Sequence, residues 1–253
     1  MPDIPILHVI LLIITGFLAG FVNTLAGGGS ALTLSVLIFL GVPANVANGT
    51  NRIALLMQNI VAVSEFKRQK QLEAKKGFLL ALPAVAGAAI GSYIAVDVSR
   101  VIIERAIAII LIVMLIMLFY KPQQWLEGNL GLQQKKLKWW LYPLFFILGI
   151  YAGFLHLGIG YAILASVVLG AGFDLVKANA IKLLVILLWT PLSIYIFYTH
   201  GQINLWYGLL LGTGNLSGAL LATKMAVKRG TGFVRWVIVT VILITTLHLL
   251  GLF

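Results

Sequence analysis

The residues of this sequence best suited to chemistry lie where glycine-rich stretches interrupt long apolar runs. Asn23-Thr24-Leu25-Ala26-Gly27-Gly28-Gly29-Ser30 interrupts one apolar segment, and His156-Leu157-Gly158-Ile159-Gly160-Tyr161 interrupts another. A helix broken at glycines exposes backbone N–H groups, and the helix that follows begins with partial positive charge. These breaks favour the binding of a small anion. The alternative is a tight turn between two helices, in which the glycines serve geometry alone.

Two basic residues, Arg52 and Lys182, lie within apolar segments, where a charged side chain is costly and by default marks a functional site. Asn48, Asn51 and Arg52 are three and four residues apart and so share a helix face. Asn179 and Lys182 repeat this spacing, with Lys182 aligned to Asn51. Two related helices would then direct amides and cations at one cavity. The alternative is that the cations extend along their helices to the membrane surface.

Several polar residues near the breaks could either bind an anion or serve a structural role. Ser30 either caps the helix that follows or donates its hydroxyl to an anion, and Asp174 is expected to cap a helix beginning at Leu175. His156 aligns with Asn23 and suits an anion donor or a proton carrier, or else a structural buried histidine. Asn215 and Ser217 are weaker candidates. The predicted substrate-binding residues are Asn23, Gly28, Gly29, Ser30, Asn48, Asn51, Arg52, His156, Gly158, Gly160, Tyr161, Asn179 and Lys182.

Composition places these residues in a membrane protein. The 253 residues are 61% hydrophobic and 10% charged, whereas about a quarter of the residues of a soluble domain are charged. The net charge of +11 comes from basic residues in short loops, which is the pattern of cytoplasmic loops and not of nucleic-acid binding. Without cysteine there are no disulfides or thiolate metal sites. We expect no cofactor and no metal, and the partners are the lipid bilayer and a small anion.

The apolar runs predict an all-α polytopic fold of ten segments in two repeats. We expect the first repeat at 1–120, a cytoplasmic linker at 121–138 and the second repeat at 139–253. Gly87 and Gly91 align with Gly214 and Gly218, in small-xxx-small patterns that allow close helix packing or a homodimer. The segments are 5–26, 30–43, 46–64, 78–96, 102–120, 139–156, 158–173, 178–198, 205–223 and 234–252. The matching residues at the first break are Gly16, Ala19, Gly20 and Phe21, which pair with Gly149, Ala152, Gly153 and Phe154.

Charge in the loops predicts that the repeats are inverted. The loop at 67–76 holds five basic residues and is expected to be cytoplasmic, whereas the equivalent loop at 199–204 holds no lysine or arginine and is expected to be external. Opposite placement of equivalent loops requires an odd number of crossings per repeat. Five crossings, or three with a re-entrant hairpin formed by the first two segments, both meet this condition. With five in each repeat, both termini are external.

Broken helices at equivalent positions of inverted repeats are typical of secondary transporters. All seven acidic residues map to loops or helix ends, so no carboxylate within a span is available to carry a proton or bind sodium. An anion channel built on the same breaks is the alternative. An intramembrane Ser–His enzyme using Ser30 and His156 is disfavoured, because rhomboid-type proteases keep a glycine after the serine and Ala31 stands here.

At these residues the sequence resembles the TauE/SafE family of sulfite and organosulfonate exporters. The resemblance rests on the stretches 20–30, 40–51 and 153–160 with Ala178-Asn179, and it covers nearly the whole chain. It implies transport of small sulfur-containing or carboxylate anions across the bacterial inner membrane without ATP hydrolysis. The family often has a second glycine pair where Tyr161-Ala162 stand, and a small hydroxyl residue near Lys182. These departures indicate a subgroup with its own anion preference.

Overall fold

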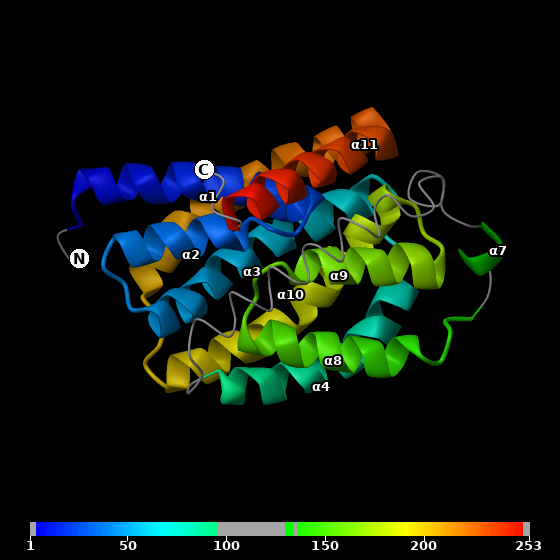
Figure 1. Cartoon of the computed structure of the whole chain (residues 1–253), viewed down its shortest axis with the longest axis horizontal. Helices are drawn as coiled ribbons and strands as arrows, with labels where there is room; N and C mark the ends of the chain where they lie inside the picture. The colour runs from blue at the N-terminus through cyan, green and yellow to red at the C-terminus, as the bar shows by residue number, and fades with distance from the viewer. Residues whose placement is uncertain (1–3, 96–129, 134–135, 250–253) are drawn as a thin grey trace.

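The computed structural model describes residues 4–95, 130–133 and 136–249, and within these ranges every regular element is a helix (Figure 1). The all-α prediction is confirmed for this part of the chain. The expected segment 102–120 and most of the expected linker lie outside the described residues.

The first half contributes four helices, and glycine and proline lie at the ends of the first three. They are α1 (Ile6–Leu25), α2 (Ser30–Phe39), α3 (Ala44–Arg68) and α4 (Ala74–Ile94). Gly27 has φ 99°, a conformation that L side chains rarely adopt, and it turns the chain between α1 and α2. Pro43 immediately precedes α3, where its fixed φ is compatible with the helix and its missing N–H costs nothing.

The second half repeats this order after a single helical turn, α7 (Leu130–Gln133). It contains α8 (Leu141–Phe154), α9 (Ile159–Ala165) continued by the π-helix Ser166–Gly170, α10 (Leu175–Thr199) and α11 (Leu205–Leu249). The Asp174 carboxylate accepts the N–H groups of Val176 and Lys177 at 2.9 and 3.0 Å, which confirms the predicted cap of α10. Gly230, at φ 74°, kinks α11 between the two segments expected there.

Within the described ranges, three helices, α1, α4 and α10, are long and apolar enough to cross a membrane. The helices beside the glycine breaks are shorter: α2 has 10 residues and α9 has 7 before its π-helical continuation. A span needs about 20 residues, so neither crosses the full hydrocarbon layer as a straight helix. This length deficit is what the sequence predicted for the two segments.

The helices pack mainly across the halves. α1 lies along α11 and α8 lies along α4, at opposite edges of the molecule (Figure 1). These are the contacts of the small-xxx-small patterns. A Cβ on Gly20 would lie 2.2 Å from the Asn215 carbonyl oxygen, and one on Gly153 would lie 2.1 Å from that of Ala88. Only glycine permits this approach of two helix backbones.

The remaining long helices fill the centre in the same crossed manner. α3 packs on α11, α10 packs on α4, and α3 and α10 contact each other. Each of these long helices therefore has its main neighbour in the other half, whereas the short helices α2 and α9 pack within their own half. The two breaks, which follow α1 and α8, are carried into the middle of the molecule by this arrangement.

The surface is apolar, and the mainly apolar core also contains polar side chains. Large apolar side chains such as Phe39, Leu82 and Trp236 are exposed, whereas Asn51, Gln58 and many other polar side chains are buried. An apolar exterior is stable against lipid, and a polar interior needs either internal partners or a ligand. The structure thus has the surface of a membrane protein and an interior built to hold polar groups.

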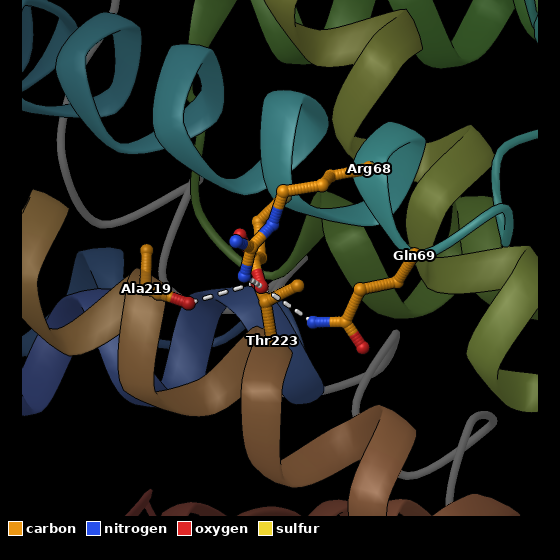
Figure 2. Close-up of polar contacts among 5 residues, drawn as sticks. Arg68, Gln69, Ala219 and Thr223 are labelled. Atoms are coloured by element: carbon orange, nitrogen blue, oxygen red, sulfur yellow. Dashed lines mark hydrogen bonds and ion pairs between the residues drawn. The ribbon is translucent and has the colours of Figure 1, made fainter.

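Side-chain hydrogen bonds fix the end of α3 that precedes the basic loop. Arg68 and Gln69 lie opposite Ala219 and Thr223 of α11 (Figure 2). The side chains of Arg68 and Gln69 donate to the Glu65 carboxylate at 2.7 and 2.5 Å. The Thr223 hydroxyl donates to the Ala219 carbonyl in its own helix. These contacts are local, and they lie at the end of α3 away from the breaks.

Candidate functional site

The two glycine breaks meet in the interior. A Cβ added to Gly27 would lie 2.5 Å from the Cα of Gly160, and one added to Gly160 would lie 2.5 Å from the Cα of Gly27. Side chains at either position would force the two backbones apart. The breaks predicted separately from the sequence therefore form one site.

At the first break the backbone offers unpaired donors. The N–H groups of Gly28, Gly29 and Ser30 have no hydrogen-bond partner among the described residues, because the first bonds of α2 come from Ala31, Leu32 and Thr33. The residue preceding α2 is Gly29, so Ser30 lies inside the first turn and does not cap the helix. Its buried hydroxyl is instead approached by the Asn23 amide at 3.5 Å, at the outer limit of a hydrogen bond.

Tyr161 fills the space above this break. Its side chain is fully buried, and a Cβ on Gly28 would lie 2.3 Å from the Tyr161 hydroxyl oxygen. That hydroxyl has no hydrogen-bond partner among the residues that the structure describes. The phenol therefore points at the N-terminus of α2 from the opposite half of the chain, with its donor unused.

Lys182 is bound to the C-terminal end of α1. Its ammonium nitrogen contacts the carbonyl oxygens of Asn23 and Thr24 at 2.9 and 3.0 Å and the Asn179 side-chain oxygen at 2.7 Å. Three acceptors match the three N–H groups of an ammonium ion. The cation satisfies carbonyls that α1 leaves free where it ends, and it lies at the negative end of the helix dipole. Extension to the membrane surface is excluded, since the side chain is fully buried.

Arg52 makes the corresponding contact with α8. One guanidinium nitrogen donates to the carbonyl oxygens of Ala152 and Gly153 at 3.1 and 2.6 Å, and the guanidinium carbon lies 4.7 Å from the centre of the Phe197 ring. The side chain is 1% exposed, so it too does not reach the surface. Its Nε–H has no hydrogen-bond partner in the described part of the chain. Arg52 thus binds the opposite helix end and keeps one donor free.

The predicted amides support both contacts. Asn179 donates to the Leu25 carbonyl at 3.1 Å, and Asn48 donates to the Phe154 carbonyl at 2.9 Å. Asn51 differs, because its side chain accepts the Thr33 hydroxyl of α2 at 2.7 Å. Sequence alignment paired Lys182 with Asn51, but the contacts pair Lys182 with Arg52, one residue further along α3.

His156 lies beside the same helix ends. Its ring packs edge-on against Trp189 with centroids 5.9 Å apart, and it lies within electrostatic range of both Arg52 and Lys182. Its Nδ1 is buried without a partner. Ser30 and His156 share no hydrogen bond in the described structure, so the Ser–His pair that a hydrolase would need is not formed.

The structure separates the predicted residues into two groups. All of the predicted binding residues lie at the breaks or on the helix faces that reach them, and Gly158, at φ 69°, forms the turn before α9 with open space beside it. The weaker candidates lie elsewhere. Asn215 approaches Gln58 at 3.4 Å at the packing of α11 on α3, and Ser217 donates to carbonyls of its own helix.

Among the described residues, four buried residues with an unpartnered polar side-chain atom were not predicted from the sequence: Thr24, Asn59, Trp189 and Gln202. Thr24 lies within the first break, but its hydroxyl offers the same chemistry as that of Ser30. Trp189 had a usable signal. A tryptophan in the middle of an apolar segment carries an N–H that needs a partner when it is buried, and of its two sequence neighbours only Thr190 has a polar side chain.

Comparison with known proteins agrees with this description. A family model described as Sulfite exporter TauE/SafE matches residues 12–249. A probable membrane transporter protein of a Sinorhizobium species is 25% identical over 99% of this chain and 95% of its own length. Probable membrane transporter proteins of Haemophilus influenzae and Escherichia coli K12 are 26% and 28% identical, each over 94% of this chain and over 92% and 88% of their own lengths. No solved structure matches the chain.

Proposed function

The chain belongs to the TauE/SafE sulfite exporter family of membrane transporters, and from that premise we propose that it carries a small anion, a sulfur oxyanion or an organosulfonate, across the bacterial inner membrane. The proposed mechanism is alternating access between two inverted repeats, 1–120 and 139–253, with both termini external. The observation that carries the proposal is the pair of buried cations beside the touching glycine breaks.

Charge balance in the interior favours an anion. Arg52 and Lys182 are buried, and the three acidic residues in the described ranges, Glu65, Glu73 and Asp174, all lie at helix ends away from them. Each helix C-terminus that the cations contact carries about half of a negative charge. The two ends together offset about one positive charge of the two, and a bound monoanion would offset the other. A charge left unbalanced in such an interior costs several kcal/mol.

Unused donors indicate where the anion binds. The free N–H groups of Gly28, Gly29 and Ser30 and the Tyr161 hydroxyl lie at the joined breaks, and the free Arg52 Nε–H belongs to a side chain bound to the end of α8 that leads into the second break. Buried donors without partners are rare in folded proteins, and each costs about 1–3 kcal/mol. An oxyanion has several acceptor oxygens and no donor, so it suits this set better than a neutral or cationic substrate.

The crossed contacts supply an element that alternating access requires. Lys182 of the second half holds the end of α1, and Arg52 of the first half holds the end of α8. A substrate anion competes with these carbonyls for the same cations, so binding is coupled to the position of both helix ends. For an exported monoanion the inside-negative potential contributes about 2.3 kcal/mol per 100 mV, so no second ion is needed to drive export.

The test measures anion binding and flux in the same protein. Thermal unfolding of the detergent-purified chain is followed with sulfite, thiosulfate, sulfate, taurine, sulfoacetate, acetate and chloride. Unfolding then shifts upward with ligand concentration for any anion that binds the folded state. We expect one sulfur oxyanion or sulfonate to stabilise the protein and to exchange across proteoliposomes. Arg52→Ala should abolish both effects, and Arg68→Ala, an exposed arginine of the same helix, should abolish neither.

Exchange kinetics separate the transporter from an anion channel. Countertransport of labelled against unlabelled anion supports alternating access, whereas single-channel currents without countertransport would assign the same site to a channel. If no anion of the panel shifts unfolding in wild-type protein, the proposal of a sulfur-anion site is wrong.

A further inference from the structure

We propose that Tyr161 is the size-determining residue of the anion site, and that it restricts the substrate to a compact oxyanion whose charged group has no long carbon chain. This inference rests on the proposed function and narrows it. It assigns the inorganic sulfur oxyanions and the smallest sulfonates as substrates, and it excludes the longer organosulfonates. Three observations lead to it.

The first observation is the position of Tyr161 in the repeat. The alignment that pairs Gly16 with Gly149 and Asn23 with His156 also pairs Gly27 with Gly160 and Gly28 with Tyr161. The contact between Gly27 and Gly160 places two equivalent positions against each other. The next equivalent pair is Gly28 and Tyr161, so this position has no side chain in the first half and a phenol in the second.

The second observation is where the phenol lies. Its hydroxyl oxygen and two of its ring carbons would lie 2.3, 3.0 and 3.1 Å from a Cβ on Gly28. The side chain thus covers the start of α2 instead of its own helix. A pair of equivalent breaks can form two half-sites around the point where they meet. Tyr161 occupies this space from the second half, so one binding place remains, at the N-terminus of α2.

The third observation is that the hydroxyl is fully buried and has no partner. A buried hydroxyl without an acceptor costs free energy that an acceptor at the site would recover. The N–H groups of Gly28, Gly29 and Ser30 are free at the start of α2. This helix is ten residues long and carries its own dipole. Tyr161 therefore serves both as a donor to the anion and as the wall beside it.

The experiment uses monoanions of equal charge and increasing length: methanesulfonate, ethanesulfonate and propanesulfonate, with sulfite alongside. Affinities come from thermal unfolding of the full chain in detergent at a series of anion concentrations. In wild-type protein we expect affinity to fall at least tenfold from methanesulfonate to propanesulfonate. In Tyr161→Gly this fall should disappear, and propanesulfonate should bind at least tenfold more tightly than it binds wild type.

Two further variants complete the design. Tyr161→Phe keeps the wall and removes the donor, so the dependence on length should remain while every affinity falls several-fold. Tyr161→Ala replaces Tyr161→Gly if the glycine variant does not fold. Phe145→Ala, which removes a fully buried ring of α8, controls for general loosening of the interior and should leave length selectivity unchanged.

The outcomes separate this inference from the proposed function. If wild type binds all three sulfonates equally, or if Tyr161→Gly and Tyr161→Ala keep the wild-type length selectivity, Tyr161 does not set substrate size, and the anion site stands. If Phe145→Ala relaxes selectivity as much as Tyr161→Gly, the effect is loosening and the inference is wrong. If wild type binds none of these sulfonates and no anion of the first panel, the proposed function fails and the inference fails with it.

Discussion

Lys182 and Arg52 hold equivalent helix ends from opposite halves of the chain, and the two contacts differ in how completely each cation is satisfied. Lys182 has three acceptors for its three N–H groups. Arg52 uses one nitrogen for two carbonyls, stacks on Phe197 and leaves its Nε–H without a partner. The breaks differ in the same way, because bare Gly28 faces the side chain of Tyr161.

This difference distinguishes the helix packing, which the two halves share, from the proposed binding site, which they do not build equally. Crossed packing of α1 on α11 and α8 on α4 is common to both halves. The free donors are unevenly distributed. The free backbone N–H groups and the Arg52 Nε–H come from the first half, whereas the second half contributes the Tyr161 hydroxyl and a lysine already bound to backbone. We infer that Lys182 is mainly a positioning residue, and that Arg52 contacts substrate directly.

The largest expected effect comes from separating the two breaks. Gly160→Ala places a methyl group 2.5 Å from the Gly27 Cα, where neither backbone can move without displacing a helix. We expect loss of folded protein after purification, measured by size-exclusion profile and thermal unfolding. Gly232→Ala, at a glycine with open space around it, should behave as wild type. Normal folding of Gly160→Ala would contradict the contact between the breaks.

The two cations should differ most clearly in stability. Lys182→Ala leaves the carbonyls of Asn23 and Thr24 and the Asn179 side chain without their shared donor, and we expect a loss of about 3 kcal/mol in unfolding free energy. Denaturant or thermal unfolding without ligand measures it. Lys177→Ala on the same helix is the control. A loss of anion affinity with unchanged stability would instead make Lys182 a direct ligand.

Arg52 should show the opposite balance. Arg52→Lys retains a cation but loses the planar group that carries the unpaired Nε–H. We expect anion affinity to fall at least tenfold, which corresponds to about 1.4 kcal/mol, with a smaller change in the unfolding temperature of ligand-free protein. Binding isotherms and ligand-free melts of the same preparation test this. Unchanged affinity would show that the free donor of Arg52 is not used.

A smaller effect is expected where Gly28 faces Tyr161. The methyl group of Gly28→Ala would lie 2.3 Å from the Tyr161 hydroxyl, which is the far end of a side chain that can turn away. Anion affinity should fall several-fold, and Tyr161→Ala in the same protein should restore space for the methyl group. A double-mutant cycle on affinity measures the coupling. Strict additivity of the two changes would mean that the side chains do not meet.

The smallest effect concerns how α10 and α3 begin. α10 starts at the Asp174 cap, whereas α3 starts after Pro43 without a side-chain cap. Asp174→Ala should therefore cost about 1 kcal/mol, seen as a lower melting temperature with anion affinity unchanged. Asp174→Asn, which keeps an acceptor oxygen, should recover most of the loss. A change in affinity would show that the carboxylate acts on the site.

Much of the fold follows from local sequence. Apolar runs, glycines and Pro43 place the helix ends, and Asp174 marks the start of α10 as expected. The short helices beside the breaks were also predicted, since a glycine break limits the run that follows it. The inverted orientation of the repeats stays a prediction, because it depends on which side of a membrane each loop faces.

The sequence alone determined which residues are costly to bury and hence worth attention: two cations, several amides and the glycine breaks. Only the tertiary structure decided what each of them contacts. Helical spacing gives a face but not the neighbour across it, so the use of Lys182 and Arg52 on the ends of α1 and α8 was not predictable. The meeting of Gly27 with Gly160, and of Gly28 with Tyr161, depends on crossed packing of helices more than a hundred residues apart. Local sequence carries no record of such a distant contact, because it is set by how whole helices fit together.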